Sequence, residues 1–156
     1  MQPLRCFTLL SVMIISEMII PLIVLSANAL CDVFRREILP VTVLVMGAAG
    51  VLYRGCYLSA GISGILTALM PGAFLLAMSI LSKDRIGKGD ALISICLGEW
   101  LGFSDSIFVI FLASAGAAAS AAVLWIIRKK DSEIPFVPFL LAGYVLHLLL
   151  LYKGSI

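Results

Sequence analysis

The stretch IFVIFLASAGAAASAAVLWII, from Ile107 to Ile127, contains only apolar or small residues and no charged one. A helix needs about 20 such residues to cross the roughly 30 Å hydrocarbon core of a bilayer. Similar runs fill most of the chain, with approximate bounds of Phe7–Leu30, Ile38–Tyr53, Cys56–Leu81, Ala91–Phe103 and Phe136–Tyr152. The sequence therefore predicts an all-α, polytopic membrane bundle of about six transmembrane helices.

Composition excludes several other classes of protein. Hydrophobic residues make up 62% of the 156 positions and charged residues 13%, against about 45–50% and about 25% in soluble domains. We therefore expect one transmembrane domain that covers residues 1–156. The net charge is only +2, and the basic residues form short clusters between apolar runs, so nucleic-acid binding is not expected. The four cysteines include no C-x-x-C pair, so we expect neither a zinc site nor a disulfide framework.

The N-terminal run has some features of a secretory signal, because Arg5 precedes it and Ala27-Asn28-Ala29 resembles a cleavage site. However, Phe7–Leu30 is longer than the roughly 7–15 apolar residues of a signal peptide, and Glu17 and Pro21 interrupt it. We interpret it as a membrane span.

Basic residues indicate the orientation. Eight of the eleven Lys and Arg residues follow the first, third and fifth spans: Arg35, Arg36, Lys83, Arg85, Lys88, Arg128, Lys129 and Lys130. Basic loops are retained on the cytoplasmic side of a membrane. We therefore expect a multi-pass protein of the inner (cytoplasmic) membrane with these loops in the cytoplasm.

Two aspartates fall at that same boundary. Asp32 closes the first span and Asp90 opens the fourth, although an ionisable group at membrane depth costs roughly 2.5–3.5 kcal/mol on insertion scales. Two carboxylates brought together can share a proton, so one can act as general base on a water molecule and the other as general acid. This chemistry hydrolyses a peptide bond with no metal and no cofactor, and we expect neither here.

Asp90 ends the G-x-G-D string Gly87-Lys88-Gly89-Asp90. Glycines permit unusual backbone angles and close approach of another chain, so an extended substrate could lie against this string. If Asp90 starts a helix, the helix dipole favours its ionised form, whereas Asp32 at a helix end is pushed toward protonation. Our hypothesis from the sequence is Asp90 as base and Asp32 as acid.

Three stretches resemble the type IV prepilin peptidases, a family of G-x-G-D intramembrane aspartyl proteases. Asp32–Pro40 is similar to the family's first motif, an aspartate followed by basic residues and Ile-Pro. Gly87–Asp90 with the following Leu97–Gly102 resembles the second motif, and Ile134–Leu140 resembles the C-terminal Ile-Pro-Phe-x-Pro-Phe-Leu string. The three stretches occur in the family order.

The resemblance implies an endopeptidase that cleaves the leader of a prepilin-like membrane protein at the cytoplasmic face, as part of a type IV pilus or a related protein-secretion system. The chain lacks the insertion with paired C-x-x-C motifs of long family members, so methyl transfer is not expected. The implied partners are the pilin or pseudopilin precursor and the lipid bilayer. The implied site consists of the catalytic Asp32 and Asp90, with Gly87, Lys88, Gly89, Pro135 and Pro138 binding substrate or shaping the site.

Two positions depart from the family pattern. Leu39 stands between Ile38 and Pro40, where the family places proline directly after isoleucine, and Leu92 occupies a position that is commonly lysine. Neither change removes a candidate catalytic carboxylate. Both bear on substrate preference and activity.

Other functions remain open at this stage. A small transporter could use Glu17, Asp90 and Glu99 as an ion path, which requires carboxylates at several depths, whereas a protease requires two at one depth. A non-catalytic assembly protein of a pilus or secretion system is another alternative. For Glu99 and His147, we expect hydrogen bonds between helices in preference to support of the two aspartates.

The two aspartates also have a plain structural interpretation. Asp32 and Asp90 could cap helices or pair with the nearby Arg35 and Lys88. Pro135 and Pro138 could likewise have no role beyond beginning a helix, where the N–H that proline lacks would have no partner within the helix.

Overall fold

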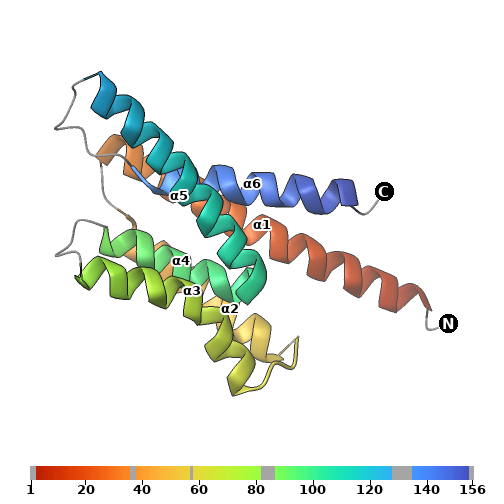
Figure 1. The fold of residues 1–156 in the computed structure, drawn as a ribbon. Coiled ribbons are helices and arrows are strands. Elements are labelled where there is room, and N and C mark those ends of the chain that lie inside the picture. Colours follow the sequence, from red (N-terminus) through yellow and green to blue (C-terminus); the bar gives the residue numbers. More distant parts are fainter. Residues whose placement is uncertain (1–2, 36–37, 57, 82–86, 128–134, 155–156) are drawn as a thin grey trace.

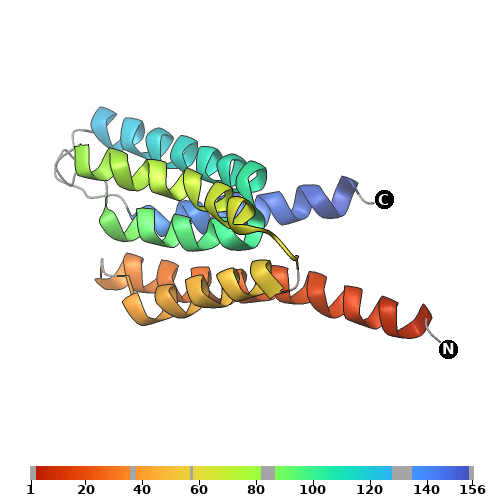
Figure 2. The same cartoon turned by 90° about the horizontal axis from the view of Figure 1, so that it is seen from below.

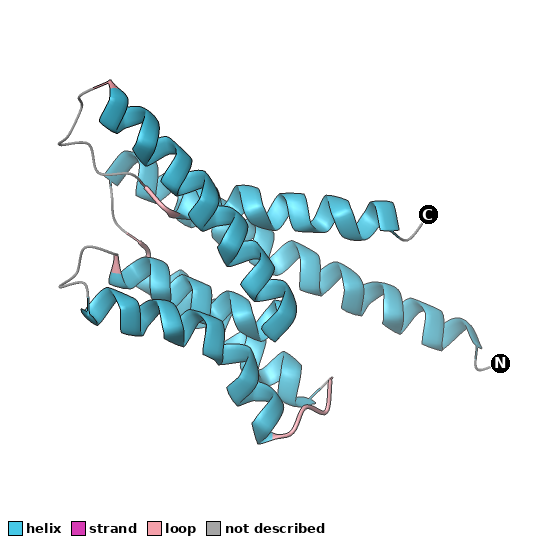
Figure 3. Cartoon of the chain, in the orientation of Figure 1, coloured by secondary structure: helices cyan, strands magenta, loops and turns pink. Residues whose placement is uncertain are grey.

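The structure is a computed structural model, and it describes every residue except 1–2, 36–37, 57, 82–86, 128–134 and 155–156. Side chains are described from Met18 onward. Within this part of the chain all regular structure is helical (Figure 3). The helices are α1 (Pro3–Arg35), α2 (Pro40–Cys56), α3 (Ile62–Leu81), α4 (Lys88–Leu101), α5 (Phe103–Ile126) and α6 (Val137–Gly154).

The prediction of an all-helical membrane bundle is confirmed. Three helices contain segments long and apolar enough to cross a membrane, namely Met18–Arg35 of α1, Ile62–Leu81 of α3 and Phe103–Ile126 of α5. α2 and α6 are apolar but shorter. α4 has 14 residues, or about 21 Å of helix, which is less than a hydrocarbon core.

Several predicted boundaries were wrong by a few residues, and two of the errors matter for the site. α1 continues past Leu30 to Arg35, so Asp32 lies inside its last turn. α4 begins at Lys88, so Asp90 lies within its first turn and not just before it. Helix ends are set by caps and loop contacts, which apolar periodicity does not report.

Two further boundary errors have local causes. α3 begins at Ile62 and not at Cys56, because the chain before it includes Ser59 with a φ of 48°. α5 begins at Phe103, directly after Gly102, whose φ of 85° ends α4. That backbone region is costly for residues with a Cβ atom, so one glycine separates α4 from α5.

One end of the bundle collects six helix ends, on the left in Figures 1 and 2. We call it the loop end. It is formed by the last residues of α1, α3 and α5 and the first residues of α2, α4 and α6: Arg35, Leu81, Ile126, Pro40, Lys88 and Val137. The three segments that carry the basic clusters therefore connect helices at the same end, as the sequence predicts.

α4 lies at the centre of the packing and contacts α3 and α2 most extensively, while α6 packs against α5 and α1 (Figure 2). Glycines make room for α4. A Cβ atom on Gly72 of α3 would meet the Ile95 backbone, and one on Gly50 of α2 would lie 2.8 Å from Cβ of Glu99. Small residues at helix contacts allow such close approach in a membrane. The short α4 is therefore held between longer helices.

Two segments rich in small residues, residues 61–64 and residues 113–119, differ in how they pack. In the alanine-rich part of α5, a Cβ atom on Gly116 would lie 3.0 Å from the Phe139 ring of α6, so the two helices pack closely there. Gly61 and Gly64 instead lie nearest to residues of their own segment. Among the described residues, no other helix therefore lies within 4 Å of the Cβ position of either glycine.

Candidate active site

Asp32 lies in the last turn of α1, and its side chain is almost fully buried. Its Oδ2 atom accepts a hydrogen bond of 3.1 Å from the backbone N–H of Val137, the first residue of α6. A carboxylate at a helix N-terminus satisfies a free donor and interacts favourably with the helix dipole. Pro138 follows as the second helical residue, where no N–H is required. Asp32 therefore fixes the start of α6 against α1.

This contact joins the first and the third of the stretches that resemble the prepilin peptidases. The sequence also allowed Asp32 to be a helix cap, and its Oδ2 atom does cap α6. A carboxylate has two oxygens and about four acceptor positions. Capping α6 through Oδ2 therefore leaves Asp32 able to act on water.

Asp90 occupies the first turn of α4, before the apolar part of that helix. Its carboxylate folds back over Gly87, because a Cβ atom on Gly87 would lie 2.7 Å from Oδ2 of Asp90. The backbone N–H of Asp90 donates to the Gly87 carbonyl oxygen at 3.1 Å. Gly87 is thus the one position of the G-x-G-D string at which a side chain would displace the Asp90 carboxylate.

Gly89 has a different neighbour. A Cβ atom on it would lie 2.5 Å from Cδ1 of Ile38, so the Ile38 side chain rests on the Gly89 backbone. The expectation of unusual backbone angles is wrong, since Gly87 has ordinary φ and ψ of −59° and 125° and Gly89 is helical. The glycines of this string provide space, and part of that space is taken by Ile38 and by Asp90 itself.

The two aspartates face a common region at the loop end. Burial raises the pKa of Asp90 to about 7, and the charge of the nearby Asp32 contributes in the same direction. This shift is opposite to the one that the helix dipole predicted for Asp90, because desolvation and a like charge outweigh the dipole. The assignment of Asp90 as base is therefore not supported, and a protonated Asp90 near neutral pH suits a general acid.

Asn28 is a site residue that the sequence analysis missed. It lies one helical turn before Asp32 and is fully buried. Its Oδ1 accepts the Leu39 N–H at 3.0 Å, and its Nδ2 donates to Oγ1 of Thr42 at 2.9 Å. These bonds hold the start of α2 against α1 and so place Ile38 over Gly89. A buried asparagine in an apolar helix was the available signal.

The same contacts explain one departure from the family pattern. The N–H of Leu39 is used by Asn28, and proline at position 39 would have no N–H to donate. The other departure, Leu92, is 48% exposed on α4. It lines a groove next to Gly89 and Ile38.

The remaining predicted site residues flank this region. Lys88 is the exposed first residue of α4. Pro135 and Pro138 are half-buried on either side of Val137, which fits both a packing role and a rim role. Residues 36–37 and Ile134, which belong to the family-like stretches, lie outside the described residues.

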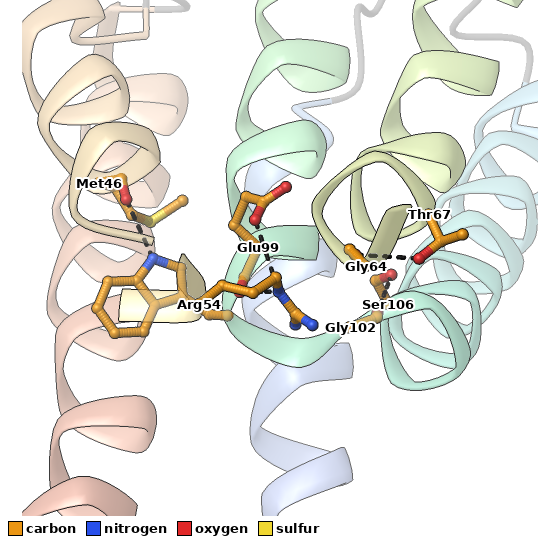
Figure 4. A network of polar contacts seen from close by, with 8 residues as sticks. Met46, Arg54, Gly64, Thr67, Glu99, Gly102 and Ser106 are labelled. Atoms are coloured by element: carbon orange, nitrogen blue, oxygen red, sulfur yellow. Dashed lines mark hydrogen bonds and ion pairs between the residues drawn. The ribbon is translucent and has the colours of Figure 1, made fainter. Parts of the chain in front are cut away.

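Glu99 and His147 lie away from the two aspartates. Glu99 is nine residues after Asp90 on α4, or about 13 Å along the helix, and its Oε2 lies 3.5 Å from Nε of Arg54 at the end of α2 (Figure 4). Arg54 Nε also donates to the Glu99 carbonyl oxygen at 2.9 Å. His147 Nε2 lies 3.8 Å from Oδ2 of Asp105, a contact between α6 and α5. Both side chains therefore contact a residue of another helix, but the expected hydrogen bonds are not made, since the Glu99 carboxylate oxygens and His147 Nε2 have no hydrogen-bond partner among the described residues.

Comparison with known protein families finds a match over most of the chain. The model of the type IV leader peptidase family matches residues 18–123, which include Asn28, Asp32 and Asp90. The chain belongs to the type IV leader peptidase family. The resemblance to prepilin peptidases is thereby confirmed, and this leader peptidase homologue is a membrane protein by its helices as well. Comparison with curated proteins and with solved structures finds no match.

The matched residues end before the third stretch, at position 123. The hydrogen bond from Val137 to Asp32 nevertheless brings the start of α6 to the site. The C-terminal helix therefore contributes a backbone donor to the site in this family member.

Proposed function

We propose that this leader peptidase homologue is an intramembrane aspartic endopeptidase that removes the leader of a prepilin-like precursor. The observation that carries the proposal is the juxtaposition of Asp32 and Asp90, a buried and a half-buried carboxyl group from different helices at one end of the bundle. An ion path would require carboxylates at several depths. The Glu17 side chain, which such a path would use, lies outside the described residues.

The geometry supports a division of roles between the two aspartates. Asp32 accepts the Val137 N–H, and a backbone donor of this kind favours the charged form of a carboxyl group, so we assign Asp32 the role of general base. The raised pKa of Asp90 keeps a proton available near pH 7, so Asp90 serves as the general acid. A pair whose environments differ in this way separates the acid and base functions.

Hydrolysis then follows in two steps. Asp32 takes a proton from water as the water oxygen bonds to the scissile carbonyl carbon, while Asp90 gives its proton to the carbonyl oxygen. When the carbon–nitrogen bond breaks, the leaving nitrogen takes the proton from Asp32. The carbonyl re-forms and returns its proton to Asp90. Both aspartates regain their starting states.

The proposed membrane face is the cytoplasmic side of the inner membrane. The connecting segments at the loop end carry most of the basic residues of the chain, and basic loops are retained in the cytoplasm. A precursor whose leader stays in the cytoplasm would present its cleavage point to Asp32 and Asp90. We propose that residues 1–156 belong to a single transmembrane peptidase domain.

Co-expression with a small prepilin-like precursor tests this function. The intact protein is expected to shorten the precursor on a gel, and Asp32→Asn and Asp90→Asn are expected to abolish the cleavage at equal membrane levels. Cleavage that survives either substitution would reject the aspartic mechanism. A panel of pilin and pseudopilin precursors that all remain uncut would favour the non-catalytic assembly protein.

A further inference from the structure

A groove lies between the first half of α2 and the first half of α4. It has a volume of about 390 Å³ and is lined by Ile38, Pro40, Val43, Leu44, Gly89, Leu92 and Cys96. Its size falls within the roughly 300–1,000 Å³ of ligand-binding pockets. Apart from the Cys96 thiol its lining side chains are hydrocarbon, so it suits an apolar occupant.

The lining residues have the spacing of a helix-binding surface. On α4 they are Gly89, Leu92 and Cys96, at positions i, i+3 and i+7, which lie on one face of a helix. The groove therefore follows α4 for about 10 Å, or two helical turns. Apolar grooves of this kind accept a helix through anchors with the same spacing.

One end of the groove adjoins the candidate catalytic pair. Its lining includes Gly89, the residue directly before Asp90, and Ile38, which rests on Gly89. A second apolar groove, between α3 and α5, is lined by residues such as Met70, Phe74 and Phe111 and shares none with the G-x-G-D string. Of these two grooves, only the α2–α4 groove would place the end of a bound helix beside Asp90.

We propose that the α2–α4 groove binds the apolar helix that follows the scissile bond of the substrate. This inference rests on the proposed peptidase function. The leader lies at the loop end, so the residues after the scissile bond run from Gly89 toward Cys96. Ile38 on Gly89 forms the end of the groove, where the substrate helix must stop and the chain can unwind over Asp90.

Leu92 and Leu44 line the two walls of this groove. They are 48% and 72% exposed and face the space from α4 and α2 respectively. A basic side chain at position 92 would put a charge into an otherwise hydrocarbon wall. The groove of this chain therefore selects an uninterrupted apolar segment of about seven residues after the cleavage point.

Disulfide crosslinking to the native Cys96 tests the occupant. Cys96 is kept as the only thiol, Asp90→Asn keeps the substrate intact, and the precursor carries one cysteine at each of ten positions after the scissile bond. The strongest adduct is expected near the seventh position, with weaker adducts three or four residues to either side. The matched control keeps only Cys56, an exposed thiol at the other end of α2, and is expected to show no such pattern.

The outcomes separate this inference from the proposed function. Cleavage by the Cys96-only protein without periodic Cys96 adducts would show that lipid fills the groove and would reject the inference alone. Adducts of equal strength with an unrelated single-span peptide would reject it too. Failure of the intact protein to cleave any precursor would reject the proposed function and this inference with it.

A kinetic test uses two adjacent residues of α2. Leu44→Trp fills the groove, whereas Val45→Trp places the same ring on a neighbouring exposed position, 59% exposed and outside the groove lining. Leu44→Trp is expected to raise KM about tenfold with a smaller change in kcat, because it removes binding common to substrate and transition state. Val45→Trp is expected to change KM by less than about twofold. Equal effects of the two substitutions would overturn the proposal.

Discussion

Each end of α4 carries a carboxyl group, and the charged neighbours of these two groups are of opposite kinds. At the loop end, Asp90 lies near Asp32, a second carboxyl group whose charge raises the pKa of Asp90. Nine residues later, Glu99 lies next to the guanidinium of Arg54. Removing one partner of a buried ion pair destabilises a fold, whereas two neighbouring carboxyl groups oppose each other's ionisation. The comparison predicts chemistry at one end of the helix and structural support at the other.

The largest expected effect is a difference in cleavage activity between substitutions of these two carboxyl groups. Asp90→Asn is expected to lower the cleavage rate by about 10²–10⁴-fold or more, the usual contribution of general acid–base catalysis. Glu99→Gln, the matching acid-to-amide change on the same helix, is expected to leave cleavage by the folded protein within a few-fold of the original. The measurement is the rate of precursor cleavage per folded molecule in detergent. A Glu99→Gln loss as large as that of Asp90→Asn would remove the distinction.

Stability is expected to show the reverse pattern. Arg54→Ala leaves Glu99 buried without its cation, and breaking a buried ion pair costs roughly 3–5 kcal/mol. The loss is expected toward the lower end of that range because Arg54 is 13% exposed. Denaturant unfolding in detergent measures the effect. The double variant Arg54→Met with Glu99→Leu should recover much of the stability, and failure to recover would show that the pair is not the cause.

The pH dependence of cleavage tests the role of Asp90 more finely. The Asp90 pKa is raised from 3.8 to about 7, so the acid is protonated below about pH 7 and lost above it. The rate is expected to fall about tenfold per pH unit above pH 7, because the fraction of protonated acid falls by that factor. A rate that rises through pH 7 to a plateau would instead identify Asp90 as the base.

The same shift predicts how stability depends on pH. Between about pH 4 and pH 7 the folded protein holds a proton on Asp90 that the unfolded chain has released. The contribution of Asp90 to the free energy of unfolding therefore falls as pH rises through this window. Asp90→Asn should remove that dependence and should not destabilise the protein at pH 8. Unfolding curves of both proteins at several pH values measure the difference.

The sequence predicted the features that depend on composition and local pattern. Apolar runs predicted six helices, and the position of two aspartates at span boundaries made Asp32 and Asp90 the candidate pair, which the fold brings near each other. The hydrogen bond from Val137 to Asp32 joins residues 105 positions apart, and nothing in a single sequence reports such a contact. The pKa of Asp90 likewise depends on burial and on Asp32, so the local helix-dipole argument gave the opposite direction.

The role of Asn28 also depends on a contact that the sequence alone does not report. In the sequence it forms part of Ala27-Asn28-Ala29, which resembles a signal-cleavage site and no catalytic motif. Its role depends on the chain returning at Leu39, where a backbone N–H meets its Oδ1. The position of a turn to within one residue is what apolar patterns predict least well. The fold therefore supplies the partner that gives this asparagine its function.

The smallest expected effect tests whether Asn28 is a positioning residue for the loop end. Asn28→Leu removes the acceptor for the Leu39 N–H and the donor to Thr42, and is expected to cost about 1–3 kcal/mol of unfolding free energy. Because Ile38 would no longer be held on Gly89, kcat for the folded protein should also fall. Ser26→Ala is the matched control, since among the described residues the Ser26 hydroxyl donates within α1, to the Leu22 carbonyl oxygen. If Asn28 is purely structural, Asn28→Leu will lower stability and leave kcat per folded molecule unchanged. Partial rescue of kcat by Asn28→Gln would support the positioning role, because an amide one methylene longer can still accept the Leu39 N–H.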